Sequence, residues 1–195
     1  ALSYDSSFIQ VYNGLAELLW KRWYLDYNPS SNFNAENCLD SILLLANTGL
    51  SYDPGNEHGY LFRGLYYSVK GTPAQAIKEY DEAIKLNPDL AQAYFMKGGL
   101  LEELDIVSSL ENFLKASSLS HGSDLVSALT RIAYLLYNSG YPEMGEKFLR
   151  EADFLECDSA VYNYKSSRIV AETTGNYLHA AEVTCRRVKR DPENV

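Results

Sequence analysis

Residues that could carry chemistry are few and widely separated along this chain. The three histidines, His58, His121 and His179, lie far from one another and from every cysteine, so the usual spacing of metal ligands is missing. No serine has an identifiable base, and neither a GxSxG nucleophile motif nor a phosphate-binding GxGxxG or GxxxxGK(S/T) motif occurs. The sequence therefore predicts no catalytic residue, no metal ligand and no cofactor site, and we expect a protein that is not an enzyme.

The densest group of carboxylates is formed by Glu102, Glu103 and Asp105. Neighbouring carboxylates act in acid–base catalysis only when one of them has a raised pKa, which the sequence alone does not show. A solvated helix end followed by a loop is the simpler interpretation of this cluster. The alternative interpretation is that these carboxylates attract a basic partner.

Composition and charge restrict the classes of partner. The 195 residues include 17 Lys and Arg against 26 Asp and Glu, a net charge of −9, which opposes general binding to nucleic acid or to an anionic membrane. No apolar run approaches the roughly 18 residues of a membrane span. The cysteines, Cys38, Cys157 and Cys185, are odd in number and form no CxxC motif, which favours a reducing compartment. We expect a cytoplasmic protein.

The stretch from His58 to Leu90 has the clearest pattern in the chain. Apolar and small residues recur at helical spacing in two runs. Gly71-Thr72-Pro73 separates the runs, and Asn87-Pro88 closes the second one. The pattern predicts a helical hairpin, in which the first helix is called helix A below and the second helix B.

Seven residues of this hairpin fall on the characteristic positions of a 34-residue repeat. They are Tyr60, Gly64, Tyr67, Ala76, Tyr80, Ala83 and Pro88. The stretch resembles the tetratricopeptide repeat family, and the resemblance implies an all-α, right-handed solenoid of about five such hairpins. Gly64 and Ala76 are small where helices A and B cross, and Pro88 ends helix B because it cannot donate a helical hydrogen bond.

Weaker copies of the pattern cover the remainder of the chain. Gly64 and Gly98 are 34 residues apart, and the predicted turns at Gly71, Asp105, Gly140 and Gly175 follow at intervals of 34 and 35. We expect one solenoid over residues 1–195, with repeats at about 5–56, 57–90, 91–123, 124–159 and 160–194. A terminal repeat is often degenerate, as the first one is here.

The resemblance also implies where a partner binds, since helix A of each repeat lines the concave surface in this family. The predicted partner-binding residues are Leu61, Leu65, Phe95, Glu102, Glu103, Tyr134 and Tyr137. We expect a scaffold that holds a peptide or protein segment there, with carboxylates for its basic residues. The alternative is a regulatory or sensor segment of a larger signalling or transcription regulator, because the order of repeats also resembles such bacterial modules.

Two further segments leave alternatives open. Residues Leu25–Asn34, rich in Asn, Ser and Pro, predict a long loop that is either a tolerated insertion or a functional loop beside the groove. In the last helix, Val183 and Val188 alternate with basic residues. That helix either caps itself or offers an apolar strip through which the C-terminal end associates.

Overall fold

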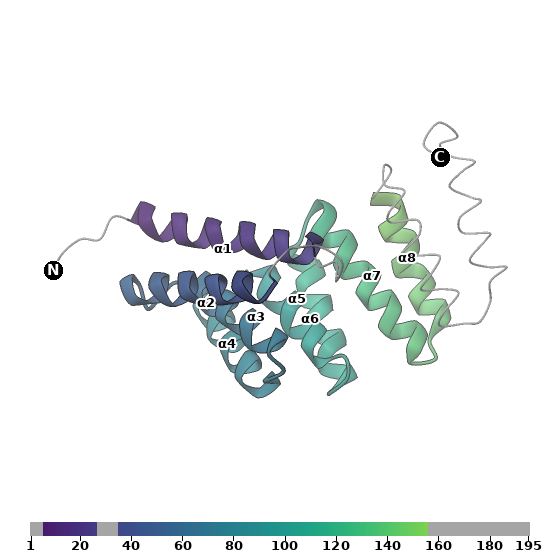
Figure 1. Cartoon of the computed structure of the whole chain (residues 1–195). Coiled ribbons are helices and arrows are strands. Elements are labelled where there is room, and N and C mark those ends of the chain that lie inside the picture. Colours follow the sequence, from purple (N-terminus) through teal and green to yellow (C-terminus); the bar gives the residue numbers. More distant parts are fainter. Residues whose placement is uncertain (1–5, 27–34, 156–195) are drawn as a thin grey trace. The chain divides into compact units, whose positions relative to one another are not determined.

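A computed structural model describes residues 6–26 and 35–155 of the chain. Over these residues the fold is entirely α-helical, as predicted (Figure 1). The helices are α1 (Ser6–Asp26), α2 (Ala35–Tyr52), α3 (Glu57–Val69), α4 (Pro73–Leu86), α5 (Ala91–Leu101), α6 (Ile106–Leu119), α7 (Gly122–Asn138) and α8 (Pro142–Leu155). The predicted loop Leu25–Asn34 is described only at Leu25 and Asp26, which belong to α1 instead. The remainder of that segment, the predicted repeat at 160–194, and Val183 and Val188 lie outside the described residues.

The chain forms two compact units, residues 1–100 and 101–195. In the first unit α1 packs on α2, α2 on α3, and α3 on α4, so neighbours in sequence are neighbours in space. Ile42 of α2 and Phe62 of α3 are buried in one apolar cluster of this unit. Leu61 of α3 and Ala76 of α4 are buried in a second cluster. Each of the helices α1 to α3 thus packs against the next helix along the chain.

The α3–α4 hairpin has the packing that its residue types predict. Tyr80 is buried, and a Cβ added to Gly64 would lie 2.7 Å from the Cδ1 and Cε1 atoms of its ring. Only glycine allows the two helices to cross at this distance. The turn between the helices passes through Gly71, whose φ of 73° disfavours other residues, and Pro73 opens α4 at a position where its missing N–H costs nothing.

The second unit repeats the same construction in α7 and α8, which pack against each other (Figure 1). Gly145 of α8 is the counterpart of Gly64, because a Cβ placed there would lie 2.8 Å from the Cδ2 atom of Tyr137. Gly140 turns the chain between the helices with a φ of 84°. Ala133 of α7 and Leu149 of α8 are buried beside Tyr137, and α6 packs on the other side of α7.

The turn between α5 and α6 contains Asp105, as the repeat spacing predicts, but helix A ends earlier than predicted. The repeat spacing aligns Asp105 with the turn glycines, but Asp105 is the N-cap of α6 and has an extended φ of −154°. Its Oδ1 accepts hydrogen bonds from the N–H groups of Val107 and Ser108, both at 3.1 Å. The pKa of the Asp105 carboxyl is lowered mainly by a hydrogen bond from the Ser108 hydroxyl, and the two backbone hydrogen bonds add to this effect. Because α5 already ends at Leu101, Glu102 and Glu103 lie in the turn rather than on helix A.

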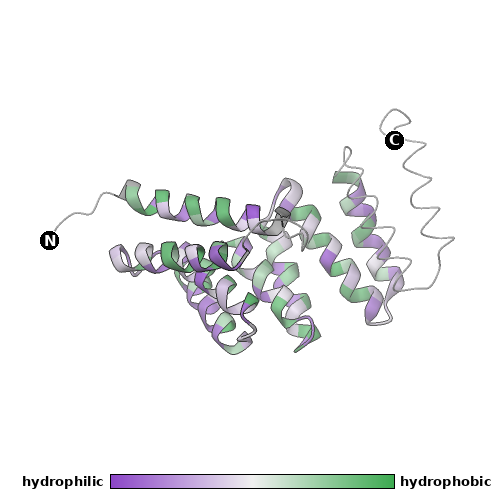
Figure 2. Cartoon of the chain, viewed as in Figure 1, coloured by the Kyte–Doolittle hydropathy of each residue, from purple (hydrophilic) through white to green (hydrophobic). Residues whose placement is uncertain are grey.

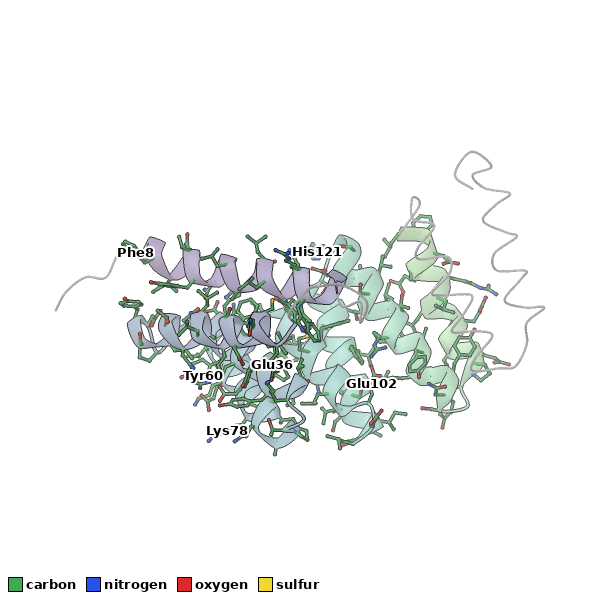
Figure 3. The ribbon with its side chains drawn as sticks, viewed as in Figure 1. Phe8, Glu36, Tyr60, Lys78, Glu102 and His121 are labelled. Carbon is green, nitrogen blue, oxygen red and sulfur yellow. The ribbon has the colours of Figure 1, made fainter. Side chains whose placement is uncertain are left out.

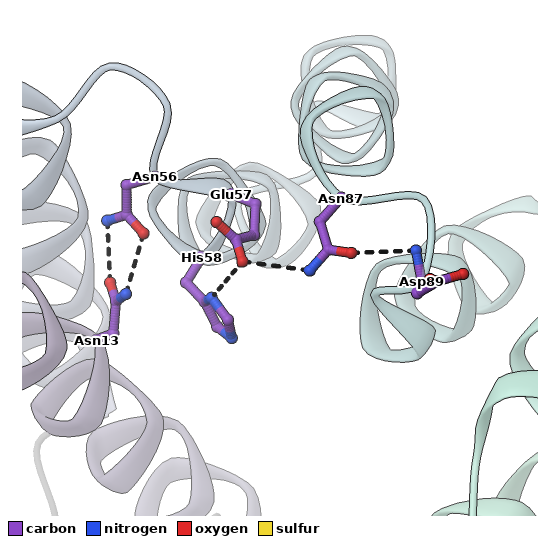
Figure 4. Close-up of polar contacts among 6 residues, drawn as sticks. All are labelled: Asn13, Asn56, Glu57, His58, Asn87 and Asp89. Carbon is purple, nitrogen blue, oxygen red and sulfur yellow. Dashed lines mark hydrogen bonds and ion pairs between the residues drawn. The ribbon is translucent and has the colours of Figure 1, made fainter.

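A pair of side-chain amides joins the first two hairpins of the first unit. Asn13 of α1 and Asn56, the residue before α3, each donate to the other through Nδ2, and both bonds are 3.0 Å (Figure 4). At the same end, the Asn87 Nδ2 group donates to the Glu57 carboxylate at 3.2 Å. Asn56 is buried, so its amide depends on Asn13 rather than on water.

We expect Asn13→Ala to lower the free energy of unfolding by about 1–2 kcal/mol, because it leaves the buried Asn56 amide without its partner. Urea denaturation followed by circular dichroism measures the change. Asn47→Ala, at an exposed position of α2, is the matched control and should be neutral or slightly stabilising. Equal losses in the two variants would show that the amide pair contributes nothing specific.

Candidate partner-binding surface

Three of the predicted partner-binding residues belong to the core of their own hairpins. In the first unit, Leu61 is 1 % exposed and packs with Ala76 and Tyr80, and Leu65 is also buried. In the second unit, Tyr137 is 6 % exposed. The prediction that these side chains face a partner is therefore corrected: they hold helix A against its neighbours.

Tyr137 shows how this change of role arises. Its ring occupies the space that Gly145 leaves open, and its hydroxyl donates to a carboxylate oxygen of Glu146 at 3.0 Å. Burial, followed by this hydrogen bond and by the charge of Glu146, raises the pKa of the Tyr137 hydroxyl above its ordinary value. The side chain is thus directed toward α8, and its polar atom is already satisfied.

The remaining predicted residues lie at least partly at the surface. Phe95 is half-buried on α5 of the first unit. In the second unit, Tyr134 is half-buried on α7, Glu103 is exposed in the turn after α5, and Glu102 lies beside α7 (Figure 3). Of the predicted set, the structure brings Glu102 and Tyr134 together, and it does so through a residue that sequence reasoning missed.

That residue is Arg131 of α7. Its guanidinium forms an ion pair with Glu102 and lies over the ring of Tyr134, 5.8 Å from the centroid. The same group is 5.9 Å from the centroid of the Phe113 ring on α6. Arg131 precedes Tyr134 by three residues, so the two share a helix face, and this spacing was the available signal in the sequence. We call Arg131, Tyr134, Glu102 and Glu103 the arginine cluster.

The electrostatics of the cluster follow from unequal burial. The Glu102 side chain is 15 % exposed, whereas that of Arg131 is 42 % exposed. Burial raises the pKa of the Glu102 carboxyl, and the positive charge of Arg131 opposes the rise. Glu102 is consequently committed to Arg131 and does not offer a free charge to a basic partner. Glu103 is the exposed carboxylate of the cluster.

This arrangement is suited to binding rather than to covalent chemistry. Arg131 keeps part of its fork of N–H donors in solvent, Tyr134 offers an aromatic surface, and Glu103 adds one negative charge. Among the described residues no group of three His, Cys, Asp or Glu side chains could hold a metal ion. Over the same residues, no helix has both the length and the apolar character needed to cross a membrane.

Comparison with known proteins agrees with this architecture. Residues 58–90 match the sequence pattern of the tetratricopeptide repeat. Sequence comparison with curated proteins gives no match.

Solved structures that resemble the chain share its fold at low identity. PilF of Pseudomonas aeruginosa has a TM-score of 0.72 at 11 % identity, over 93 % of this chain and 77 % of its own. TTC0263, a thermophilic tetratricopeptide protein of Thermus thermophilus, has a TM-score of 0.65 at 11 % identity, over 94 % and 93 %. YrrB, described as a tetratricopeptide protein with an unusual peptide-binding site, has a TM-score of 0.59 at 18 % identity, over 93 % and 86 %.

These likenesses concern the fold, and the match to the tetratricopeptide repeat pattern concerns residues 58–90. Residues 58–90 carry the sequence of the repeat, and the helices on either side of them have the architecture of solved repeat proteins. Such a fold generally serves as a scaffold for protein–protein interaction. Residues 58–90 thus match a tetratricopeptide repeat, and the described helices share the fold of a solved tetratricopeptide protein.

Proposed function

We propose that this protein is a non-catalytic scaffold that binds a peptide or a segment of a partner protein on its concave helix-A face. The observation that supports the proposal most is the arginine cluster, in which a partly exposed guanidinium is held between an ion pair and an aromatic ring. A side chain fixed in this way binds without losing much rotamer freedom. Peptide binding by the similarly folded YrrB is consistent with such a role.

The chemistry of the cluster indicates what the bound segment contains. The Arg131 N–H groups left in solvent suit backbone carbonyls or one carboxylate, and the Tyr134 ring suits an apolar or aromatic side chain. The exposed Glu103 and the net charge of −9 favour basic residues elsewhere in the segment. Phe95 of the first unit is proposed as a separate aromatic contact.

Selection of peptides from a displayed random library, followed by titration calorimetry of the tightest one, tests the proposal. We expect Tyr134→Ala, and separately Phe95→Ala, to weaken binding by about 1–3 kcal/mol at every salt concentration. Glu103→Gln should weaken binding by less, and its effect should shrink as salt screens the exposed charge. Tyr141→Ala, at an exposed tyrosine before α8, is the matched control and should bind like the wild type.

Two results would contradict the proposal. In the first, Tyr134→Ala and Phe95→Ala both bind the selected peptide as tightly as the control, and the contact then lies on another face. In the second, no peptide is enriched while the protein remains folded, and a short segment is then not the ligand.

A further inference from the structure

Arg131 of the arginine cluster lies between a buried carboxylate and solvent. Its guanidinium pairs with Glu102, whose side chain is much less exposed than its own. The centroids of the Phe113 and Tyr134 rings lie 5.9 and 5.8 Å from the Arg131 Cζ atom, so two contacts that do not depend on Glu102 hold the guanidinium in place. In Figure 2 hydrophilic residues lie among the hydrophobic residues of α7, and Arg131 is the one basic residue of that helix. The guanidinium is therefore fixed, and its solvent side is open to a second anion.

The charges of the arginine cluster oppose such an anion at neutral pH. Arg131 carries one positive charge, whereas Glu102 and Glu103 together carry two negative charges. A carboxylate of a bound segment would be a second carboxylate on the same guanidinium, with a third close by. Two carboxylates that share one site cannot both stay ionised without a cost in free energy, and one of them then binds a proton more readily.

Glu102 is the carboxylate that would take up this proton. Burial raises the pKa of its carboxyl, Arg131 opposes the rise, and Glu103 adds to it. A ligand carboxylate on Arg131 would weaken that opposition, because it places a negative charge beside the guanidinium. The other charged residues of the elements around this turn are exposed or already paired: Lys97 on α5, which pairs with Asp81, Asp105, Glu111 and Lys115 on α6 and its cap, and Asp124 on α7.

We propose that Arg131 binds one carboxylate of the partner segment on its solvent side, and that Glu102 takes up one proton from the solution in the same step. This inference rests on the proposed function, since it concerns how the arginine cluster holds its segment and how that binding is regulated. The proton forms an O–H bond on the Glu102 carboxylate and neutralises it. The cluster thus accepts a negative ligand without gaining negative charge.

Proton uptake determines the sign of the pH dependence. A binding step that takes up a proton becomes stronger as the pH falls. The gain is complete below the pKa of Glu102 in the free protein, which is raised from its ordinary value, and it is lost as the pH rises through the still higher pKa in the complex. An aspartate of the ligand has an ordinary pKa of about 3.9 and stays ionised at pH 5. Measurements at pH 5 and pH 7 therefore compare the same ligand charge with different protonation of Glu102.

Two synthetic peptides test the inference, acetyl-Lys-Phe-Asp-Lys-amide and the same peptide with Asn in place of Asp. The phenyl ring suits Tyr134, the lysines suit Glu103, and the aspartate is the carboxylate for Arg131. Titrations of the isotope-labelled 195-residue protein followed by NMR give the dissociation constants. We expect the Asp peptide to bind no better than the Asn peptide at pH 7 and about three- to tenfold better at pH 5. Comparing the two peptides at each pH cancels the titration of other charges.

Glu102→Gln separates the proton from the other features of the site. Its neutral amide needs no proton, so this variant should prefer the Asp peptide at pH 7 as well as at pH 5. Glu151→Gln, at an exposed carboxylate of α8, is the matched control and should behave like the wild type. Circular dichroism should show that both variants are folded. In the wild type, the pKa of Glu102 measured from the ¹³C resonance of its carboxyl should rise with saturating Asp peptide and stay unchanged with the Asn peptide.

Either of two outcomes overturns the inference. If the Asp peptide at pH 5 binds no better than the Asn peptide, or does not bind, Arg131 takes no carboxylate. If the preference for the Asp peptide is equal at both pH values in the wild type, or changes with pH as much in Glu102→Gln, Glu102 is not the group that takes up the proton. The proposed function is unaffected by these outcomes, because it fails instead when Tyr134→Ala and Phe95→Ala leave binding of the selected peptide unchanged.

Discussion

Tyr80→Ala is expected to lower the free energy of unfolding by about 3–5 kcal/mol, the largest effect among the changes considered. The Tyr80 side chain is the largest of those that are almost completely buried in the described chain. It packs with Leu61, Ala76 and Ala83, so its removal leaves a cavity at the centre of the α3–α4 hairpin. Burial also raises the pKa of its hydroxyl, which is hydrogen-bonded to Ser68. Urea denaturation at neutral pH measures the loss.

The contact between Tyr80 and Gly64 can be isolated by a double-mutant cycle. Gly64→Ala alone should destabilise by about 1–3 kcal/mol, because its Cβ would lie 2.7 Å from the buried ring. In the Tyr80→Ala background the same substitution should cost almost nothing, so the two effects should be strongly non-additive. Gly99→Ala is the control: Gly99 is exposed with no atom near its Cβ, and alanine there should be neutral or slightly stabilising. Additive effects of Gly64→Ala and Tyr80→Ala would contradict the crossing contact.

This contact also explains why so much of the fold was accessible from the sequence. Gly64 and Tyr80 lie 16 residues apart within one hairpin. The tyrosine ring fits between the helices only because residue 64 has no Cβ, so the two residue types are informative together. The turn residues Gly71 and Pro73 have equally local roles, because their own backbone preferences set the geometry. Where identity and spacing alone determine packing, as in this hairpin, prediction and structure agree.

The side chains that point out of helix A were harder to predict than the hairpins, because a helical face has no sharp edge. Tyr137 lies at the border between the predicted partner-facing side of helix A and the side that contacts helix B, and the space left by Gly145 lets its ring turn inward. Leu61 is buried for a related reason, since the small side chains of Ala76 and Ala93 let it into the core. Whether such a side chain turns into the core depends on the shape of the neighbouring helix. The spacing of apolar residues along the sequence gives no information about that shape.

The pairing of Glu102 with Arg131 was missed for a different reason. The residues are 29 positions apart and lie in different repeats, so no helical spacing relates them. The premature end of α5 at Leu101 places Glu102 in a turn, where it reaches α7. A carboxylate that appeared from the sequence to be solvated is instead the buried member of an ion pair. The identity of its cation follows only from the packing of consecutive elements.

Arg131→Met should reveal how much the ion pair between Glu102 and Arg131 contributes to the free energy of unfolding. The substitution keeps an unbranched side chain near Phe113 and Tyr134 but removes the charge that opposes the cost of burying Glu102. Breaking a fully buried pair costs about 3–5 kcal/mol, and because Arg131 is 42 % exposed we expect a smaller loss of about 2–3 kcal/mol at pH 7. Urea denaturation measures it.

The pH dependence of this loss separates charge from packing. The pKa of Glu102 is raised in the folded protein, so the folded state binds its proton more readily than the unfolded state, whose Glu pKa is about 4.3. The stability linked to this group is therefore complete below about pH 4.3 and is lost as the pH rises through the folded pKa. Removing Arg131 raises that pKa further.

The difference in the free energy of unfolding between the wild type and Arg131→Met should consequently be greatest at pH 7. It should shrink on acidification toward about pH 4.5. Adding Glu102→Gln should recover most of the loss at pH 7, because the neutral amide has no charge to bury. A deficit that is equal at both pH values and is not recovered by Glu102→Gln would show that Arg131 stabilises the second unit through its contacts with the Phe113 and Tyr134 rings.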